Sequence, residues 1–261
     1  MGDTNATVER DVTIETLDGT CDAALFYPKT GSYPGVLIWA DAFGLRPTMR
    51  GIARRLAAQG YCVLLPNPFY RVSRAPLTDD AAGFDFQNPA DLAKLQPLLA
   101  SVTAPRNAER DAVAYAAFLD AQPQVDTARK IGAQGYCMGG ALMVRTAAAL
   151  PERIGAGASF HGGSLVTDKP ESPHLLAPRI KARMYFGVAA SDDARQPDAK
   201  DKLKSAFEAA HVPVEVEVYP DTLHGWCVPD MPPRDGAPVY NQPAAERAWG
   251  KLLDLYKACL R

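Results

Sequence analysis

Gly135-Tyr136-Cys137-Met138-Gly139 is the stretch of this chain that decides its fold. The segment 130–134 before it predicts a strand, and the alanine-rich segment 141–149 after it predicts a helix. Glycines two positions before and two positions after Cys137 let the backbone turn sharply, where larger side chains would collide. Such a turn exposes the sulfur beside the positive end of a helix, which favours the thiolate. The stretch therefore predicts a cysteine nucleophile between a strand and a helix.

Outside this stretch, segments typical of strands alternate with segments typical of helices. Strands are expected at 12–16, 23–27, 35–40, 61–65, 130–136, 154–161, 183–188 and 214–219. Helices are expected at 49–58, 91–99, 109–120, 139–150, 199–210 and 243–259, and Pro97 leaves the end of the second one open. This alternation predicts an α/β fold with a mostly parallel central sheet covered by helices on both faces. Ligand sites in such sheets lie where the strands end.

The overall composition limits the classes of partner and the compartment. The 261 residues, expected to form a single domain over 1–261, carry 28 basic and 30 acidic residues, a balance that indicates neither a nucleic-acid nor a membrane partner. Residues 1–11 lack the apolar segment of a signal peptide, and no apolar run approaches the roughly 20 residues of a membrane span. The five cysteines form no CxxC pair. We expect a cytoplasmic protein with reduced thiols and with neither a metal nor a cofactor.

A cysteine nucleophile needs a base, and the chain has four histidines from which to choose. His174 lies in a proline-flanked stretch, and His211 ends an expected helix. His161 follows the strand after the cysteine turn, and its expected role is to line the pocket or to hold a loop. His224 follows the last strand, which fits the chain order nucleophile, acid, histidine found in hydrolytic triads on such turns. We therefore predict that His224 is the base.

The acid that orients His224 is expected after the strand 183–188. Asp192 and Asp193 both follow this strand, and either carboxylate can stabilise the charged form of a histidine. Position alone leaves the two aspartates as alternatives.

Taken together, these residues resemble the dienelactone hydrolase family within the α/β-hydrolases, over roughly residues 12–256. The most specific similarity is Gly135-Tyr136-Cys137-Met138-Gly139-Gly140. The turn of the family acid is similar to 190–192 and the loop of the family histidine is similar to 223–226. The resemblance implies an α/β-hydrolase fold and favours Asp192 over Asp193.

The resemblance also implies roles for the stretch Ala40-Asp41-Ala42-Phe43-Gly44. Its acidic residue, Asp41, takes the place of a family glutamate that regulates the thiol, and it is one methylene shorter. The N–H groups of Ala42 and Met138 are implied as the oxyanion hole.

Substrate contacts are implied at five positions: Phe43, Tyr70, Arg71, His161 and Trp226. In the family, arginines bind a substrate carboxylate, and Arg71 lies in the segment that supplies one of them. Cys227 and Val228 stand where the other is expected, which leaves Arg46 and Arg74 as alternatives.

The predicted function is the opening of a small lactone or ester through an acyl-thioester on Cys137, by a monomer or a homodimer whose partner is this small molecule. Two alternatives remain on the same scaffold. A thiol-redox or stress protein would oxidise Cys137 and resolve it with Cys62 or Cys227. A non-catalytic protein would bind a small molecule in the same pocket without converting it.

Overall fold

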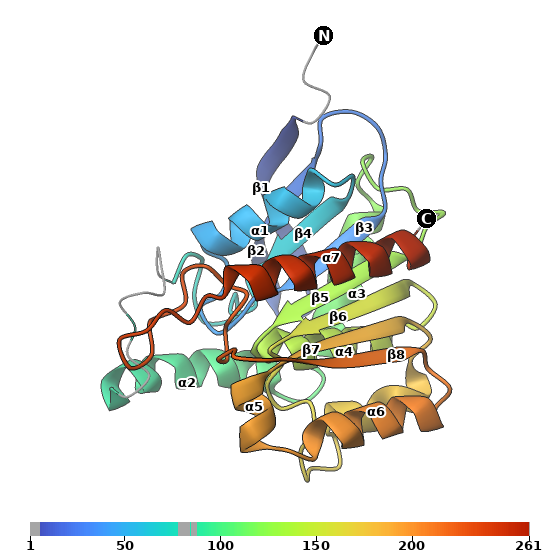
Figure 1. Ribbon diagram of the computed structural model, residues 1–261. Coiled ribbons are helices and arrows are strands. Elements are labelled where there is room, and N and C mark those ends of the chain that lie inside the picture. The colour runs from blue at the N-terminus through green and yellow to red at the C-terminus, as the bar shows by residue number, and fades with distance from the viewer. Residues whose placement is uncertain (1–5, 78–83, 85–87, 261) are drawn as a thin grey trace.

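The computed structural model describes residues 6–77, 84 and 88–260. Within these residues the chain forms an eight-stranded sheet in the order β1-β2-β4-β3-β5-β6-β7-β8 (Figure 1). The strands are β1 (Thr7–Thr16), β2 (Gly19–Pro28), β3 (Gly35–Trp39), β4 (Cys62–Pro66), β5 (Ile131–Tyr136), β6 (Ile154–Phe160), β7 (Arg183–Ala189) and β8 (Val214–Tyr219). β2 is antiparallel to β1 and β4, whereas β4, β3 and β5 to β8 are parallel. The predicted α/β fold with a mostly parallel sheet is confirmed.

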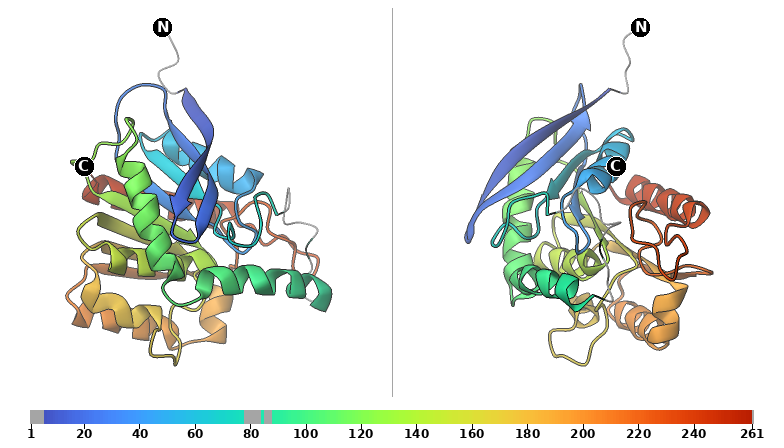
Figure 2. Two further views of the ribbon diagram at one scale, coloured as in Figure 1. Left: turned by 180° about the vertical axis from the view of Figure 1, so that it is seen from behind. Right: turned by 90° about the vertical axis from the view of Figure 1, so that its left-hand side faces the viewer.

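Helices cover both faces of the sheet. They are α1 (Pro47–Ala57), α2 (Pro89–Thr103), α3 (Asn107–Asp120), α4 (Met138–Ala149), α5 (Ala190–Arg195), α6 (Ala199–Ala209), α7 (Gln242–Cys259) and the 3₁₀ helix η1 (Pro173–Arg179). α1 and α7 pack on one face, and α3, α4 and α6 pack on the other (Figure 2). None of the helices in the described ranges is long and apolar enough to cross a membrane.

The apolar run of β3 shows why this strand lies in the middle of the sheet. All five of its residues are buried. Leu37 and Trp39 join the apolar cluster under α3 and α4, whereas Val36 and Ile38 join the cluster under α1 and α7. Side chains alternate between the two faces along a strand, so a continuous apolar run fits a sheet that is covered on both sides.

Three helical segments differ from the sequence prediction, and one of them, the 3₁₀ helix η1, was not expected at all. α2 continues through Pro97 to Thr103. Pro97 is exposed, so water can bind the carbonyl group that loses its intrahelical partner. The short helix α5 covers residues for which only a loop was expected after β7. Asp192 consequently lies in the first turn of a helix.

Candidate active site

Cys137 lies at the tip of a strained turn between β5 and α4. Its backbone has φ 53° and ψ −120°, a conformation that residues other than glycine rarely adopt. A methyl group at Gly135 would lie 1.9 Å from the Gly139 carbonyl oxygen, and one at Gly139 would lie 2.4 Å from the Trp39 carbonyl oxygen. Both glycines of the motif are therefore required by close approaches of backbone to backbone, as the sequence predicted.

Hydrogen bonds from two neighbouring segments hold this strained residue. The Cys137 N–H donates to the Phe160 carbonyl at 3.1 Å and to His161 Nδ1 at 3.2 Å. The Cys137 carbonyl accepts from the N–H groups of Gly140 and Gly163, each at 3.0 Å. The end of β6 thus fixes the backbone of Cys137.

His224 lies between Asp192 and the cysteine. Its Nδ1 is 2.7 Å from Asp192 Oδ2. Burial disfavours the imidazolium, but hydrogen bonds with Asp192 and with the Cys137 side chain outweigh burial and raise the pKa of His224 to about 10. The three groups form a chain in the order Cys137, His224, Asp192, which is the geometry that can activate a thiol.

The structure separates the two candidate aspartates. Asp192 contacts His224 and also forms an ion pair with Arg195, whereas Asp193 binds Lys200 Nζ at 2.7 Å. Asp192, the aspartate that the family resemblance favours, is therefore the one in contact with His224.

Two small polar residues missed by the sequence analysis join the loops that carry the acid and the histidine. Ser191 Oγ accepts from the His224 N–H at 3.0 Å. Thr222 Oγ1 accepts from the Ala190 N–H at 3.1 Å and donates to the Tyr219 carbonyl at 2.7 Å. Short polar side chains beside a predicted acid and a predicted histidine are the signal that could have identified them.

His161 is fully buried against the site rather than available to a substrate. Its Nδ1 accepts from the Cys137 N–H, so the neutral ring carries its proton on Nε2. The His161 and His224 rings meet edge to face with centroids 5.0 Å apart. Burial, together with the charge of His224, holds the pKa of His161 well below its usual value. His161 thus contacts the backbone of Cys137, and its predicted role, to line the pocket or to hold a loop, stays a prediction.

Cys137 opens into a cavity of about 1480 Å³, here called the Cys137 groove. Ala42 and Met138, the residues implied for the oxyanion hole, line it together with Cys137. Met138 is the first residue of α4, where a backbone N–H has no intrahelical acceptor. The rest of the lining comes from α2, α3, α4, the segment 163–173 and η1.

Asp41 has different contacts from those expected of a thiol-regulating acid. Its two carboxylate oxygens lie 2.6 and 3.0 Å from the Arg46 guanidinium, and both residues are buried. Arg46 also binds both carboxylate oxygens of Asp230 at 2.7 Å. Phe43, implied as a substrate contact, is buried and donates its N–H to Asp41. Arg46 thus forms a buried ion-pair network with Asp41 and Asp230. Its guanidinium group has partners within the fold and is not available to bind a substrate carboxylate.

Three further implied substrate contacts lie outside the Cys137 groove, as far as the structure describes the chain. The Arg71 guanidinium binds Asp111 and Asp18, and the Tyr70 hydroxyl donates to Asp111 at 2.9 Å. Trp226 is fully buried and stacks on Tyr219 at a centroid distance of 4.3 Å. Partners within the fold engage Tyr70 and Arg71, and Trp226 is buried, so the structure places none of the three in this groove.

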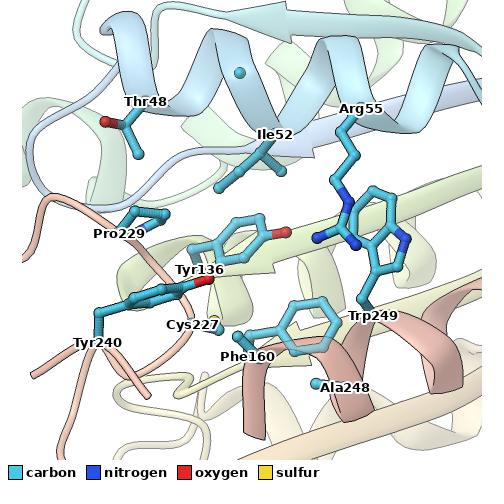
Figure 3. A pocket seen from close by; sticks show the side chains of 12 residues that line it. Thr48, Ile52, Arg55, Tyr136, Phe160, Cys227, Pro229, Tyr240, Ala248 and Trp249 are labelled. Carbon is cyan, nitrogen blue, oxygen red and sulfur yellow. The ribbon is translucent and has the colours of Figure 1, made fainter. Parts of the chain in front are cut away.

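A second, smaller cavity of about 300 Å³ lies between α1 and α7 (Figure 3). Tyr136 and Phe160, which immediately precede Cys137 and His161, line it from the sheet, together with Trp249 from α7. Cys227 also lines this cavity, and burial raises the pKa of its thiol well above the usual value. The loop between β8 and α7 thus contributes to this second cavity.

Comparisons with known proteins show the family of this chain. The model of the Dienelactone hydrolase family matches residues 21–260. A carboxymethylenebutenolidase of Rhodococcus opacus is 27% identical over 232 residues, which cover 88% of this chain and 83% of that protein. Among solved structures, the protein m3DLH is 26% identical with a TM-score of 0.81, covering 98% of this chain and 100% of its own. A dienelactone hydrolase-like promiscuous phosphotriesterase from metagenomic libraries shares the fold at 24% identity, with a TM-score of 0.76 and coverage of 98% and 100%. With 240 of its residues matched by the family model and a strained cysteine turn at its centre, this chain belongs to the dienelactone hydrolase family of α/β-hydrolases.

Proposed function

We propose that this hydrolase cleaves carboxylic esters or lactones with Cys137 as the nucleophile, His224 as the base and Asp192 as the residue that orients His224. The observation that carries the proposal is the 2.7 Å contact between His224 Nδ1 and Asp192, on a histidine whose pKa is raised by Asp192 and by the Cys137 side chain. The name of the Rhodococcus opacus relative supports a lactone among the substrates.

The first half of the reaction forms an acyl-enzyme. His224 holds the proton of Cys137, and the thiolate sulfur adds to the substrate carbonyl carbon. The N–H groups of Ala42 and Met138 stabilise the oxyanion, and one such donor is typically worth about 3–4 kcal/mol. When the carbon–oxygen bond breaks, the alcohol leaves with the proton from His224.

The second half releases the acid. Neutral His224 takes a proton from water as the hydroxide attacks the thioester carbonyl, and the carbon–sulfur bond breaks to restore the thiolate and the charged histidine. Asp192 stabilises that charge and keeps the ring in the required orientation. A lactone follows the same steps, with the alcohol and the acid released as one molecule.

The thiol-redox alternative is less well supported. Burial raises the pKa of the Cys62 thiol to about 12 and that of Cys227 well above its usual value. A thiol of this kind is a poor partner for resolving an oxidised cysteine, because the thiolate is the reactive form.

The test is steady-state turnover of p-nitrophenyl acetate by the wild type and three variants. Cys137→Ala and His224→Ala are expected to lose activity by at least about 1,000-fold, the scale seen when a triad member is removed. Cys259→Ala is the matched control, because it removes a partly exposed thiol at the end of α7. Retained turnover in Cys137→Ala would refute the proposal.

A further inference from the structure

We propose that the Cys137 groove binds the acyl part of the substrate and that this part is a medium or long apolar chain. The inference rests on the proposed function and specifies its substrate class. It departs from the small lactone that the sequence predicted.

The size of the Cys137 groove is the first observation. Its volume of about 1480 Å³ exceeds the roughly 300–1,000 Å³ of most small-molecule sites. The lining includes Met138 at the start of α4 and Ala149 at its end. At 1.5 Å of rise per residue, the groove follows α4 for about 16 Å from the nucleophile.

The chemistry of the lining is the second observation. α2 contributes Leu92, Leu95 and Leu99, and α3 contributes Val113. Leu92 and Val113 are 40% and 53% exposed, which places them among the most exposed large apolar side chains of the described residues. Exposed apolar side chains that gather in one groove mark a surface that an apolar ligand covers.

Five cationic side chains of the described ranges line the groove, and two of them, Arg110 and Arg145, lie beside the apolar residues of α3 and α4 and have partners within the fold. Arg145 bonds to Glu109 at 3.1 Å and to the Glu171 carbonyl at 2.8 Å, and Arg110 bonds to Asp18 at 2.8 Å. These two guanidinium groups are engaged within the fold, so the part of the groove between α2, α3 and α4 offers mainly leucine and valine side chains, whereas Arg106, Lys169 and Arg179 contribute charge elsewhere in the lining. An uncharged chain fits this lining.

The position of His224 decides which side of the ester lies in the groove. The leaving alcohol must take its proton from His224, so it departs on the side of that ring. Among the described residues the groove is lined by Ala42, Cys137, α2, α3, α4, the segment 163–173 and η1, and neither His224 nor Asp192 contributes. The groove therefore extends from Cys137 away from His224, on the side that holds the acyl chain.

The experiment compares kcat/KM for p-nitrophenyl acetate, butyrate, octanoate and laurate below their micelle concentrations. Each methylene that enters an apolar groove contributes up to about fourfold, so octanoate is expected to exceed acetate by on the order of 100-fold. Leu92→Asp is expected to reduce the octanoate-to-acetate ratio by at least about 10-fold. Leu17→Asp is the matched control, since Leu17 is exposed outside the groove.

A second variant tests the length of the groove. Ala149→Phe fills its far end and is expected to lower the laurate-to-butyrate ratio. A flat or falling dependence on chain length, with turnover still abolished in Cys137→Ala, would overturn the acyl assignment and leave the proposed function standing. Turnover that persists in Cys137→Ala would instead remove the proposed function on which the inference rests.

Discussion

At the scale of single residues, adjacent carboxylates have different tasks because their partners differ. Asp192 bonds to His224, whereas Asp193 bonds to Lys200 on the neighbouring helix α6. One position along the chain thus separates the proposed orienting acid from an aspartate in an ion pair, and a substitution series can measure the difference.

Asp192→Asn is expected to lower kcat/KM by on the order of 1,000-fold to 10,000-fold, because the amide no longer stabilises the charged histidine. Asp193→Asn is the matched control and should retain activity within a few-fold. Both are measured with p-nitrophenyl acetate. Equal losses in the two variants would contradict the assignment of Asp192.

The pKa of His224 links this residue to stability as well as to activity. Its folded-state pKa of about 10 exceeds the unfolded value of about 6.5, so its pairing stabilises the fold fully below pH 6.5. This contribution falls as the pH rises through about 10. Urea unfolding of the wild type and His224→Gln across this window should show a stability difference that shrinks with increasing pH. A difference that grows instead would mean that His224 is not held as the charged partner.

At the scale of elements, the strands and most helices could be predicted from the sequence because their signals are local. Five consecutive apolar residues make β3 a buried strand, and the glycines on either side of Cys137 permit the tight turn. In both cases the residues that predict the element also cause it. α5 could not be predicted in this way, since a six-residue helix carries too little periodicity.

The turn between β5 and α4 leaves no room for a side chain at Gly135. Gly135→Ala would place a methyl group 1.9 Å from the Gly139 carbonyl oxygen, so the variant is expected to lose at least about 3 kcal/mol of unfolding free energy. Gly250→Ala is the control, because this exposed glycine of α7 has no atom within 4 Å of the added methyl group. It should gain up to about 1 kcal/mol. Unchanged stability in Gly135→Ala would show that the turn is not the tight one described.

At the scale of the whole molecule, buried Arg46 joins distant parts of the chain. It binds Asp41 after β3 and Asp230 in the loop after β8, the loop that also carries His224. The same kind of long-range pairing explains why the contacts of Asp41 and Arg71 could not be predicted from the sequence. Arg71 and Asp41 are the expected residue types at the expected places, but their partners, Asp111 and Arg46, are fixed by tertiary structure.

Arg46→Leu is therefore expected to cost about 3–5 kcal/mol of unfolding free energy, because it leaves buried Asp41 without a cation. Lys181→Ala breaks an exposed ion pair with Glu152 and should leave the melting temperature unchanged. Differential scanning calorimetry compares the two variants. Equal melting temperatures would contradict a structural role for the Arg46 network.

The central claim is that Cys137 becomes acylated, and trapping the acyl-enzyme tests it most directly. The wild type is mixed with excess p-nitrophenyl acetate, quenched in acid within one turnover and analysed by intact-mass and peptide mass spectrometry. We predict one acetyl group per chain, on Cys137 and on none of the other four cysteines, with none in Cys137→Ala. Acetyl groups on another residue, or turnover with no acylated Cys137, would contradict the account.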